Sequence, residues 1–369
     1  MTATLAAPHV RPLIMPESAD AADAADFVQM VRVRNEVYRE LNGYDDESRT
    51  PAEMLPLLQS GPYELTLPWI ALLEEQIVGR GILNLPLEDG SRVADVTIEL
   101  LPRVWGHGVG SALYAVLERA AREHGRTVLQ TWAYHPTRAP IAPGDAAPWL
   151  DSPTGFGRVP QDHSARFAHA HGFALEQVER TSALELTADA DARIQALLMP
   201  AQRAAAGYRI VRWMPPTPPE LIDGYAWLKS RMVTDAPAAG LELDEQVWDA
   251  ARVADHERPV LAAGRTMLIT AAEHIESGEL VAFNELVIGR DLTAATFQED
   301  TLVRADHRGH RLGMLLKCAG LLAWRRLAPD SPRVITYNAE ENRPMLQINE
   351  AIGFAPIAYL GAWKKTLIR

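Results

Sequence analysis

The sequence is poor in cysteine, in net positive charge and in long apolar runs, and each shortage excludes a class of protein. Cys318 is the only cysteine among 369 residues, which excludes an internal disulfide and a zinc site built from several thiolates. The formal net charge is −12 at pH 7, so the chain has no field to attract a nucleic-acid backbone. No stretch approaches about 20 apolar residues without a charge, and we expect no membrane contact. The first 20 residues lack a basic segment followed by an apolar core, so we expect a cytoplasmic protein.

What the sequence does contain is one unit written twice. The matching pairs are Gly106 with Gly309, Gly110 with Gly313, Thr131 with Thr336, and Gly172 with Gly353. The offset is 203 at the first two pairs, 205 at the threonines and 181 at the last pair. The shorter last offset leaves about 24 extra residues in the first copy, and the Pro- and Gly-rich stretch 134–161 that holds them is predicted to be a loop. The repeat therefore predicts two tandem domains.

Both copies have the same order of predicted elements. A β-branched or apolar strand leads into a glycine-rich turn, an apolar-periodic helix, a buried strand, another helix and a Gly-Phe pair. The predicted strands are 94–101, 128–132, 295–303 and 334–338, with hairpins at 69–73/76–85 and 267–272/280–288 and further helices at 22–41, 219–232 and 245–255. This pattern predicts an α+β (α/β three-layer) fold with two domains, each a mixed, mostly antiparallel sheet flanked by helices. We place the first domain at 1–185, a linker at 186–206 and the second domain at 207–369.

Each glycine-rich turn opens a helix, which is a common way to bind phosphate. Unpaired N–H groups and the positive end of the helix dipole face the turn, and glycines let an anion approach the backbone. Neither turn has the sequence of a Walker loop or the glycine spacing of a dinucleotide-binding loop. Taken alone, the glycines are explained equally well by a tight strand-to-helix corner.

The wider pattern resembles the GCN5-related N-acetyltransferase (GNAT) superfamily. Its signature is Val-x-Pro followed by Arg/Gln-x-x-Gly-x-Gly/Ala, and the chain carries related sequences at 100–111 and 301–314. The second copy is also similar to the C-terminal module of a bacterial tandem group, with Lys317 and the stretch 336–342 through Phe354 as matching residues. Mycothiol synthase has the same tandem layout. Two positions depart from the signature: Trp105 replaces the opening Arg/Gln of the first turn, and Arg311 replaces the middle glycine of the second.

The resemblance implies that acetyl-CoA is the co-substrate and that no metal is needed. The turn amides would hold its pyrophosphate, the strand before each turn its pantetheine arm, and asparagines after the later strand its amides. The residues implied are Leu302, Val303, Arg308, Gly309, His310, Arg311, Leu312, Gly313, Met314, Asn338 and Asn342 in the second copy, and Leu100, Leu101, Gly106, His107, Gly108, Val109, Gly110 and Ser111 in the first. Because the second turn carries Arg308 and Arg311, we expect CoA to bind more tightly there.

Acyl transfer needs a base for the amine and a proton source for the thiolate. The carboxylates on the strand before the second turn suit the base, in the order Glu299, then Asp300, then Glu285 on the neighbouring strand. Strict strand alternation predicts that Glu299 and Asp300 face opposite sides of the sheet. The family often places a tyrosine four residues before the final Gly-Phe glycine, where this chain has Asn349 and Ala168; Tyr337 and Tyr359 are the nearest substitutes.

The resulting hypothesis is an N-acyltransferase that moves an acetyl group from acetyl-CoA to a small-molecule amine by direct attack, with the chemistry in the second domain. The partner is therefore a small molecule, with no nucleic acid and no membrane, and the chain is expected to be a monomer or homodimer. The alternative is a non-catalytic sensor or scaffold that binds acyl-CoA, which the missing tyrosines favour. An amine panel with acetyl-CoA separates the two, since a sensor binds without turnover.

Overall fold

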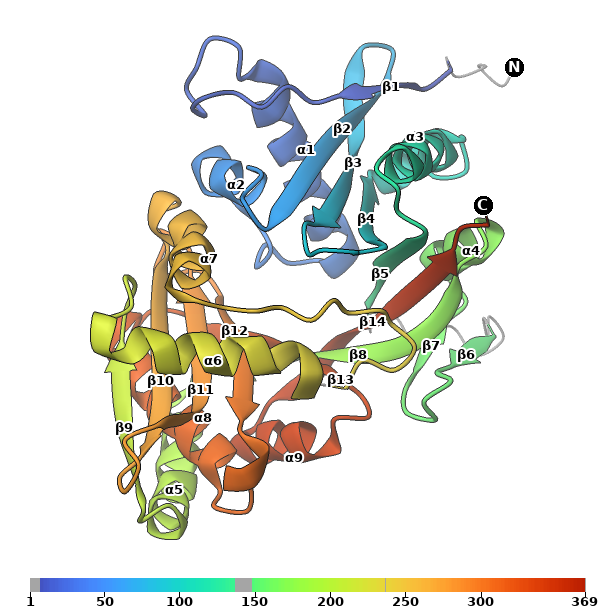
Figure 1. The fold of residues 1–369 in the computed structure, drawn as a ribbon. Coiled ribbons are helices and arrows are strands. Elements are labelled where there is room, and N and C mark those ends of the chain that lie inside the picture. The colour runs from blue at the N-terminus through green and yellow to red at the C-terminus, as the bar shows by residue number, and fades with distance from the viewer. Residues whose placement is uncertain (1–6, 137–147, 236, 369) are drawn as a thin grey trace.

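The computed structural model describes residues 7–136, 148–235 and 237–368, coloured along the chain in Figure 1. The strands of the N-terminal half are β1 His9–Pro12, β2 Glu64–Leu73, β3 Gln76–Pro86, β4 Val93–Leu100, β5 Val128–Pro136, β6 Trp149–Asp151, β7 Arg158–Pro160 and β8 Ala174–Glu185. Its helices are α1 Ala25–Asn42, α2 Pro51–Leu57, the short 3₁₀ turn Pro102–Val104, α3 Val109–Glu123 and α4 His163–Ala170. The connecting helix α5 Ala188–Ala204 follows, within the predicted linker.

The C-terminal half repeats this order. Its strands are β9 Tyr208–Trp213, β10 Thr266–His274, β11 Leu280–Ile288, β12 Thr296–Val303, β13 Arg333–Ala339 and β14 Ala355–Thr366. Its helices are α6 Pro219–Asp235, α7 Ala250–Ala262, the 3₁₀ turn Ala305–His307, α8 Leu312–Leu327 and α9 Arg343–Ile352. The predicted fold class is confirmed: a mixed sheet lies between helical layers in both halves.

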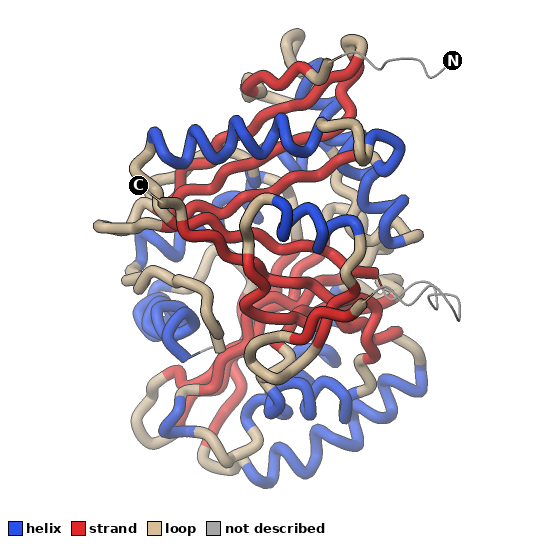
Figure 2. The backbone as a smooth tube through the Cα atoms, turned by 90° about the vertical axis from the view of Figure 1, so that its right-hand side faces the viewer, coloured by secondary structure: helices blue, strands red, loops and turns tan. Residues whose placement is uncertain are grey.

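The two halves share one sheet of twelve strands, which runs through the molecule without a break in Figure 2. The strand order is β1-β2-β3-β4-β5-β14-β8-β13-β12-β11-β10-β9. The last strand of each half is therefore exchanged: β14 pairs with β5, and β8 pairs with β13. Trp363 of β14 is fully buried in the N-terminal core, and Leu184 of β8 is buried in the core beneath α8. The division at 186–206 stays a prediction, but each half is completed by a strand from the other.

Side-chain parity on β11 shows which helices cover each face of the C-terminal sheet. Phe283 packs in a cluster with Tyr225 of α6, whereas Leu286 packs with Cys318 of α8. Residues of opposite parity point to opposite faces of a strand, so α6 and α8 lie on different sides. Helix α6 crosses the strands on the near side in Figure 1, and α7 packs beside it. Helices α5 and α9 pack with α8 on the other side.

Two predicted boundaries differ from the structure. The helix predicted over 245–255 begins at Ala250, because the Asp249 side chain accepts a hydrogen bond from the Arg252 N–H and caps it there. The stretch predicted as a loop contains the pair β6 and β7, while its residues 137–147 lie outside the described part. No helix in the described ranges is long and apolar enough to cross a bilayer.

Candidate active site

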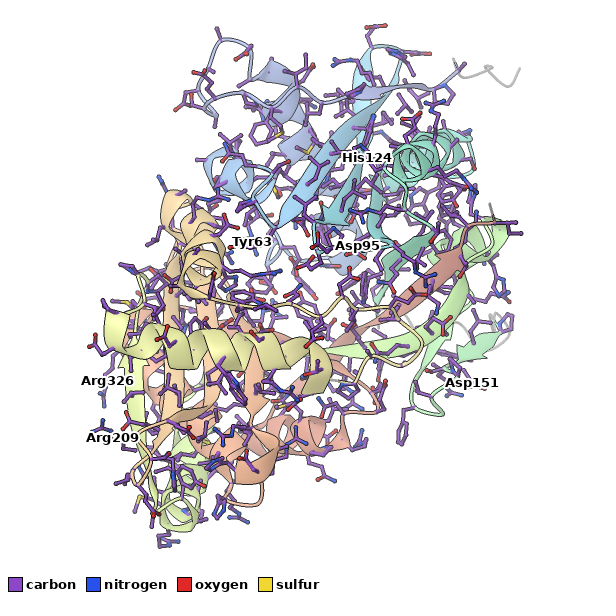
Figure 3. All side chains as sticks on the ribbon, viewed as in Figure 1. Tyr63, Asp95, His124, Asp151, Arg209 and Arg326 are labelled. Atoms are coloured by element: carbon purple, nitrogen blue, oxygen red, sulfur yellow. The ribbon has the colours of Figure 1, made fainter. Side chains whose placement is uncertain are left out.

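In each half the strand before the glycine turn separates from its parallel neighbour. Strand β4 pairs with β5 from Val93 to Asp95, and the two strands then diverge. Strand β12 pairs with β13 from Thr296 to Gln298 and diverges in the same way. A V-shaped opening between parallel strands frees backbone N–H and C=O groups for a ligand that lies between them. Figure 3 labels Asp95, at the closed end of the N-terminal opening.

The N-terminal opening continues into a cleft of about 440 Å³. Of the predicted residues, Leu100, Gly106, Gly108, Gly110 and Ser111 line this cleft. Gly106 and Gly108 have φ angles of 77° and 79°, and a Cβ on either would meet no atom within 4 Å, so the turn is open to a ligand. Leu101 and Val109 are instead fully buried in the core, while His107 is exposed.

Trp105, which stands where the family usually has Arg or Gln, keeps a hydrogen bond from the turn to the strand but carries no positive charge. The Trp105 Nε1–H donates to the Leu100 carbonyl at 3.2 Å. The Arg308 Nε–H donates to the Val303 carbonyl at the same distance and at the equivalent position. A side-chain N–H therefore ties each turn to its strand, but only the second turn has a positive charge there. The Trp105 ring also stacks on His163, with 4.3 Å between ring centroids.

The second turn is exposed from Arg308 to Arg311, and Arg311 occupies a left-handed conformation with φ 57° as the N-cap of α8. Beyond it, Leu312 and Gly313 are buried and Met314 is partly buried. Leu302 is buried, and Val303 is partly buried.

The two histidines of the second turn lie against Tyr208. His307 Nδ1 and the Tyr208 hydroxyl are hydrogen-bonded at 2.9 Å, and the His310 ring packs near the Tyr208 ring. Within the described ranges no three His, Cys, Asp or Glu side chains are grouped to hold a metal ion.

A β-bulge in β12 overturns the prediction from strict alternation. Asn284 pairs with Thr301 and Leu286 with Gln298, so Glu285 alone lies opposite both Glu299 and Asp300. One extra residue in a ladder rotates the chain, and the side chains that follow change face. Asp300 consequently points to the α6 side, where Lys229 Nζ lies 2.6 Å from its Oδ2. The carboxylates of Glu285 and Asp300 therefore share a face, and the expectation that alternation separates Glu299 from Asp300 is wrong.

Gln298 pairs with Leu286, which packs on the α8 side, so its neighbour Glu299 points to the α6 side, where the charges of Asp300 and Lys229 act on it. Glu299 is the exposed member of the three carboxylates. Its strand neighbour two residues back, Phe297, is stacked under Arg49 of the α1–α2 connection at 4.8 Å. The surrounding protein partly removes the Glu299 carboxylate from water, and this desolvation raises its pKa above 4.5. The nearby positive charge of Arg265 opposes that rise. A solvent-accessible carboxylate with a raised pKa is suited to accept a proton.

The other two carboxylates are held by buried partners. Glu285 is 1% exposed, accepts a hydrogen bond from Tyr225, and has Lys229 Nζ 3.2 Å from its Oε1. Burial raises the pKa of Glu285 to about 7, in spite of Lys229. Burial would also raise the pKa of Asp300, but the ion pair with Lys229 outweighs it and lowers the pKa below 3.8. Asp300 therefore stays ionised and paired.

Carboxylates in the N-terminal half are arranged differently. Glu99 lines the cleft, but it is paired with Arg80 and accepts a hydrogen bond from Tyr38 at 2.7 Å. Burial would raise the pKa of Glu99, but Arg80 and Arg34 outweigh it and lower the pKa below 4.5. Asp95 is partly buried at the base of the opening, where desolvation raises its pKa to about 6.

Tyr337, the predicted proton donor, is occupied by a residue of the other half. Its hydroxyl donates to Glu47 Oε1 at 2.8 Å. Burial and the Glu47 charge together raise the pKa of Tyr337 well above 10. Asn338 accepts a hydrogen bond from Asn349, and Asn342 is the N-cap residue of α9 without a side-chain cap bond. Sequence reasoning did not find Lys229, whose only signal was a charge on an otherwise apolar helix face.

Comparison with known proteins agrees with this geometry. The profile of the Acetyltransferase (GNAT) family matches residues 34–140. A tandem GNAT protein from the clavulanic acid biosynthesis pathway superposes with a TM-score of 0.72, at 26% identity over 98% of both chains. Residues 34–140 thus match the GNAT family itself, and the whole chain is similar in structure to a tandem GNAT protein. A comparison with curated proteins gave no match.

Two further solved structures share this fold. The GCN5-related N-acetyltransferase from Sphaerobacter thermophilus has a TM-score of 0.60 and 14% identity, over 97% of this chain and 95% of that one. A fungal multi-domain GH3 β-N-acetylglucosaminidase contains a GCN5-related glucosamine N-acetyltransferase region that superposes with a TM-score of 0.58. That alignment has 13% identity and covers 98% of this chain but 38% of the fungal one.

Proposed function

We propose that this protein transfers an acetyl group from acetyl-CoA to a small-molecule amine, with the chemistry in the C-terminal half. The observation that carries the proposal is the bulge in β12, which gathers Glu285, Glu299 and Asp300 on one face beside the point where β12 and β13 diverge. A positioned base next to an opening that admits a thioester is the minimum that amine acylation needs.

The order of events follows from the two faces of the sheet. The acceptor amine approaches from the α6 side, where Glu299 removes its proton. The neutral nitrogen attacks the thioester carbonyl between the divergent strands and the C–N bond forms. The nitrogen of this adduct loses its second proton to solvent, and the C–S bond breaks as the electron pair leaves with sulfur, which gives the neutral amide. The bulge takes one residue of β12 out of the ladder, which makes a backbone N–H in this stretch a candidate donor to the carbonyl oxygen.

The N-terminal half has a different role in this proposal. Its open cleft and open glycine turn support acyl-CoA binding, whereas Glu99, the carboxylate that lines the cleft, is paired with Arg80 and is not free to accept a proton. Both halves then bind CoA, and one of them catalyses.

The test is turnover by the full chain, followed as release of free CoA thiol with a panel of primary amines. Acetylated product with at least one amine, dependent on acetyl-CoA, supports the proposal. Calorimetric binding of acetyl-CoA without turnover of any amine supports the alternative, a non-catalytic acyl-CoA-binding protein, which Asn349 and Ala168 at the tyrosine positions favour.

A further inference from the structure

A chain of three polar side chains crosses the interface between α8 and α9. Lys317 of α8 is 0% exposed, and its Nζ donates to Asn349 Oδ1 at 2.8 Å. Asn349 of α9 is 1% exposed, and its Nδ2 donates to Asn338 Oδ1 at 2.7 Å. Asn338 lies on β13 two residues beyond Thr336, which is the last residue paired with β12. The chain of hydrogen bonds therefore ends on the divergent part of β13.

The internal repeat shows where this chain lies relative to a CoA cleft. The offsets that relate the two copies place Lys317 at the position of Tyr114, Asn349 at that of Ala168, and Asn338 at that of Ala133. All three N-terminal counterparts line the open cleft. Lys317, Asn349 and Asn338 thus occupy the positions of the C-terminal half that correspond to this cleft, on the α8 side of the sheet.

This side is opposite to the one that holds the proposed base. Glu285 and Asp300 contact Lys229 of α6, whereas Lys317 and Asn349 lie between α8 and α9. In the tetrahedral adduct the C–S bond points away from the new C–N bond, so a proton donor on the α8 side can serve the sulfur while the amine occupies the α6 side. We propose that Lys317 donates the proton to the CoA sulfur in the C-terminal half, a step that rests on the proposed function.

The step balances as a simple proton transfer. When the C–S bond breaks, the electron pair stays on sulfur, and the Lys317 ammonium gives one proton to it. The products are CoA thiol and a neutral Lys317 amine, which takes a proton from water before the next cycle. Asn349 orients the ammonium by accepting its hydrogen bond and so acts as a positioning residue.

The surroundings of Lys317 suit this task. Burial lowers the pKa of Lys317 to about 7, and the neighbouring Cys318 thiol is the one ionisable group that opposes the shift. An ordinary lysine, with a pKa of about 10.4, would protonate a thiolate of pKa about 8.5 only against the equilibrium. Lys229, the other buried lysine among the described residues, contacts two carboxylates that raise its pKa. It therefore keeps its proton and cannot replace Lys317.

The test compares Lys317→Met with the matched control Lys364→Met in the full chain. Lys364 donates to the Gly240 carbonyl, away from the α8–α9 interface, so its loss controls for removing a bonded lysine. With acetyl-CoA, Lys317→Met should lower kcat about 10²–10³-fold and abolish the decline of kcat as pH rises through about 7. With p-nitrophenyl acetate, whose leaving group needs no proton, the loss should be about tenfold or less. Equal losses with both donors, or an unchanged pH profile, would overturn the assignment.

A second measurement does not depend on turnover. The Nζ resonance of Lys317 in the wild-type chain with isotope-labelled lysine, assigned by its absence from Lys317→Met, is followed by NMR as pH is varied with CoA and with desulfo-CoA. Contact with the thiol should change the chemical shift of Lys317 Nζ in CoA but not in desulfo-CoA, and identical titrations would overturn the assignment. If no amine is acetylated but this difference is present, the proposed function fails while Lys317 still contacts the sulfur.

Discussion

Replacing Glu299 by glutamine should separate catalysis from stability. Glu299 is exposed and its pKa is raised above 4.5, so its ionised form is disfavoured in the folded protein. A raised carboxylate pKa contributes stability that is fully present below pH 4.5 and is lost as pH rises through the folded value. At pH 8 the neutral glutamine should therefore leave the free energy of unfolding unchanged or slightly higher. Turnover should fall about 10²–10⁴-fold, and the rise of kcat with pH should disappear.

Asp300→Asn should show the opposite pattern, because Asp300 is engaged by Lys229. A hydrogen bond to a charged group contributes about 1.5–3 kcal/mol, and the Asp300 side chain is 39% exposed, so solvent screening reduces the expected loss to about 1–2 kcal/mol. The pKa of Asp300 is lowered from 3.8, so this stabilisation is present above pH 3.8 and vanishes as pH falls through the folded value. Turnover should fall much less than in Glu299→Gln.

Urea unfolding at pH 8 and pH 3.5, together with kcat measured from pH 5 to pH 9, tests both variants. A loss of stability in Glu299→Gln with normal turnover would refute its assignment as the base. If both variants keep full turnover, Glu285→Gln is the next variant to test, because burial raises the pKa of Glu285 to about 7. If Asp300→Asn alone loses turnover, the base has been assigned to the wrong residue of the bulge.

Three further perturbations test the binding cleft and the contacts between the halves. Gly108→Ala should strain a backbone with φ 79° by about 1–2 kcal/mol and place a methyl group on the open face of the turn, weakening CoA binding in the N-terminal half about tenfold by calorimetry. The Tyr337→Phe and Glu47→Gln pair should give a coupling free energy of about 1.5–3 kcal/mol in a double-mutant cycle of urea unfolding, and simple additivity would contradict the contact. Gln130→Ala removes both hydrogen bonds to the Glu242 backbone and should speed limited proteolysis between residues 237 and 249; an unchanged cleavage rate would argue against that role.

The sequence predicted most elements and the duplication, because both depend on local patterns. The strand predicted over 280–288 has those bounds in the structure, and Leu113 and Leu117 are fully buried on the predicted face of α3. The bulge was not predictable from alternation, because alternation assumes that each residue of β12 lies opposite a single residue of β11. A bulge depends on the partner strand and leaves no period-2 signal.

The strand exchange was also not predictable. Strands β8 and β14 follow equivalent Gly-Phe pairs, so their local sequences predict the same element in both halves. Which neighbour each strand pairs with is decided by contacts far apart in the chain, such as Trp363 in the N-terminal core. The loss of the opening Arg at Trp105 was predicted as a loss of charge, but the structure shows that the indole N–H keeps the bond to the strand.

The contacts between the halves also bear on how the acceptor side is built. The α1–α2 connection reaches β12 and β13 through Arg49 and Glu47, while the α6–α7 connection reaches β5 through the Glu242 backbone. Each connection therefore lies beside the strand opening of the opposite half. With β8 and β14 exchanged as well, an acceptor bound at the C-terminal opening meets residues of the N-terminal half. The N-terminal half would therefore remain necessary for activity even without catalytic groups of its own, because the C-terminal half needs strand β8 and the α1–α2 connection from it.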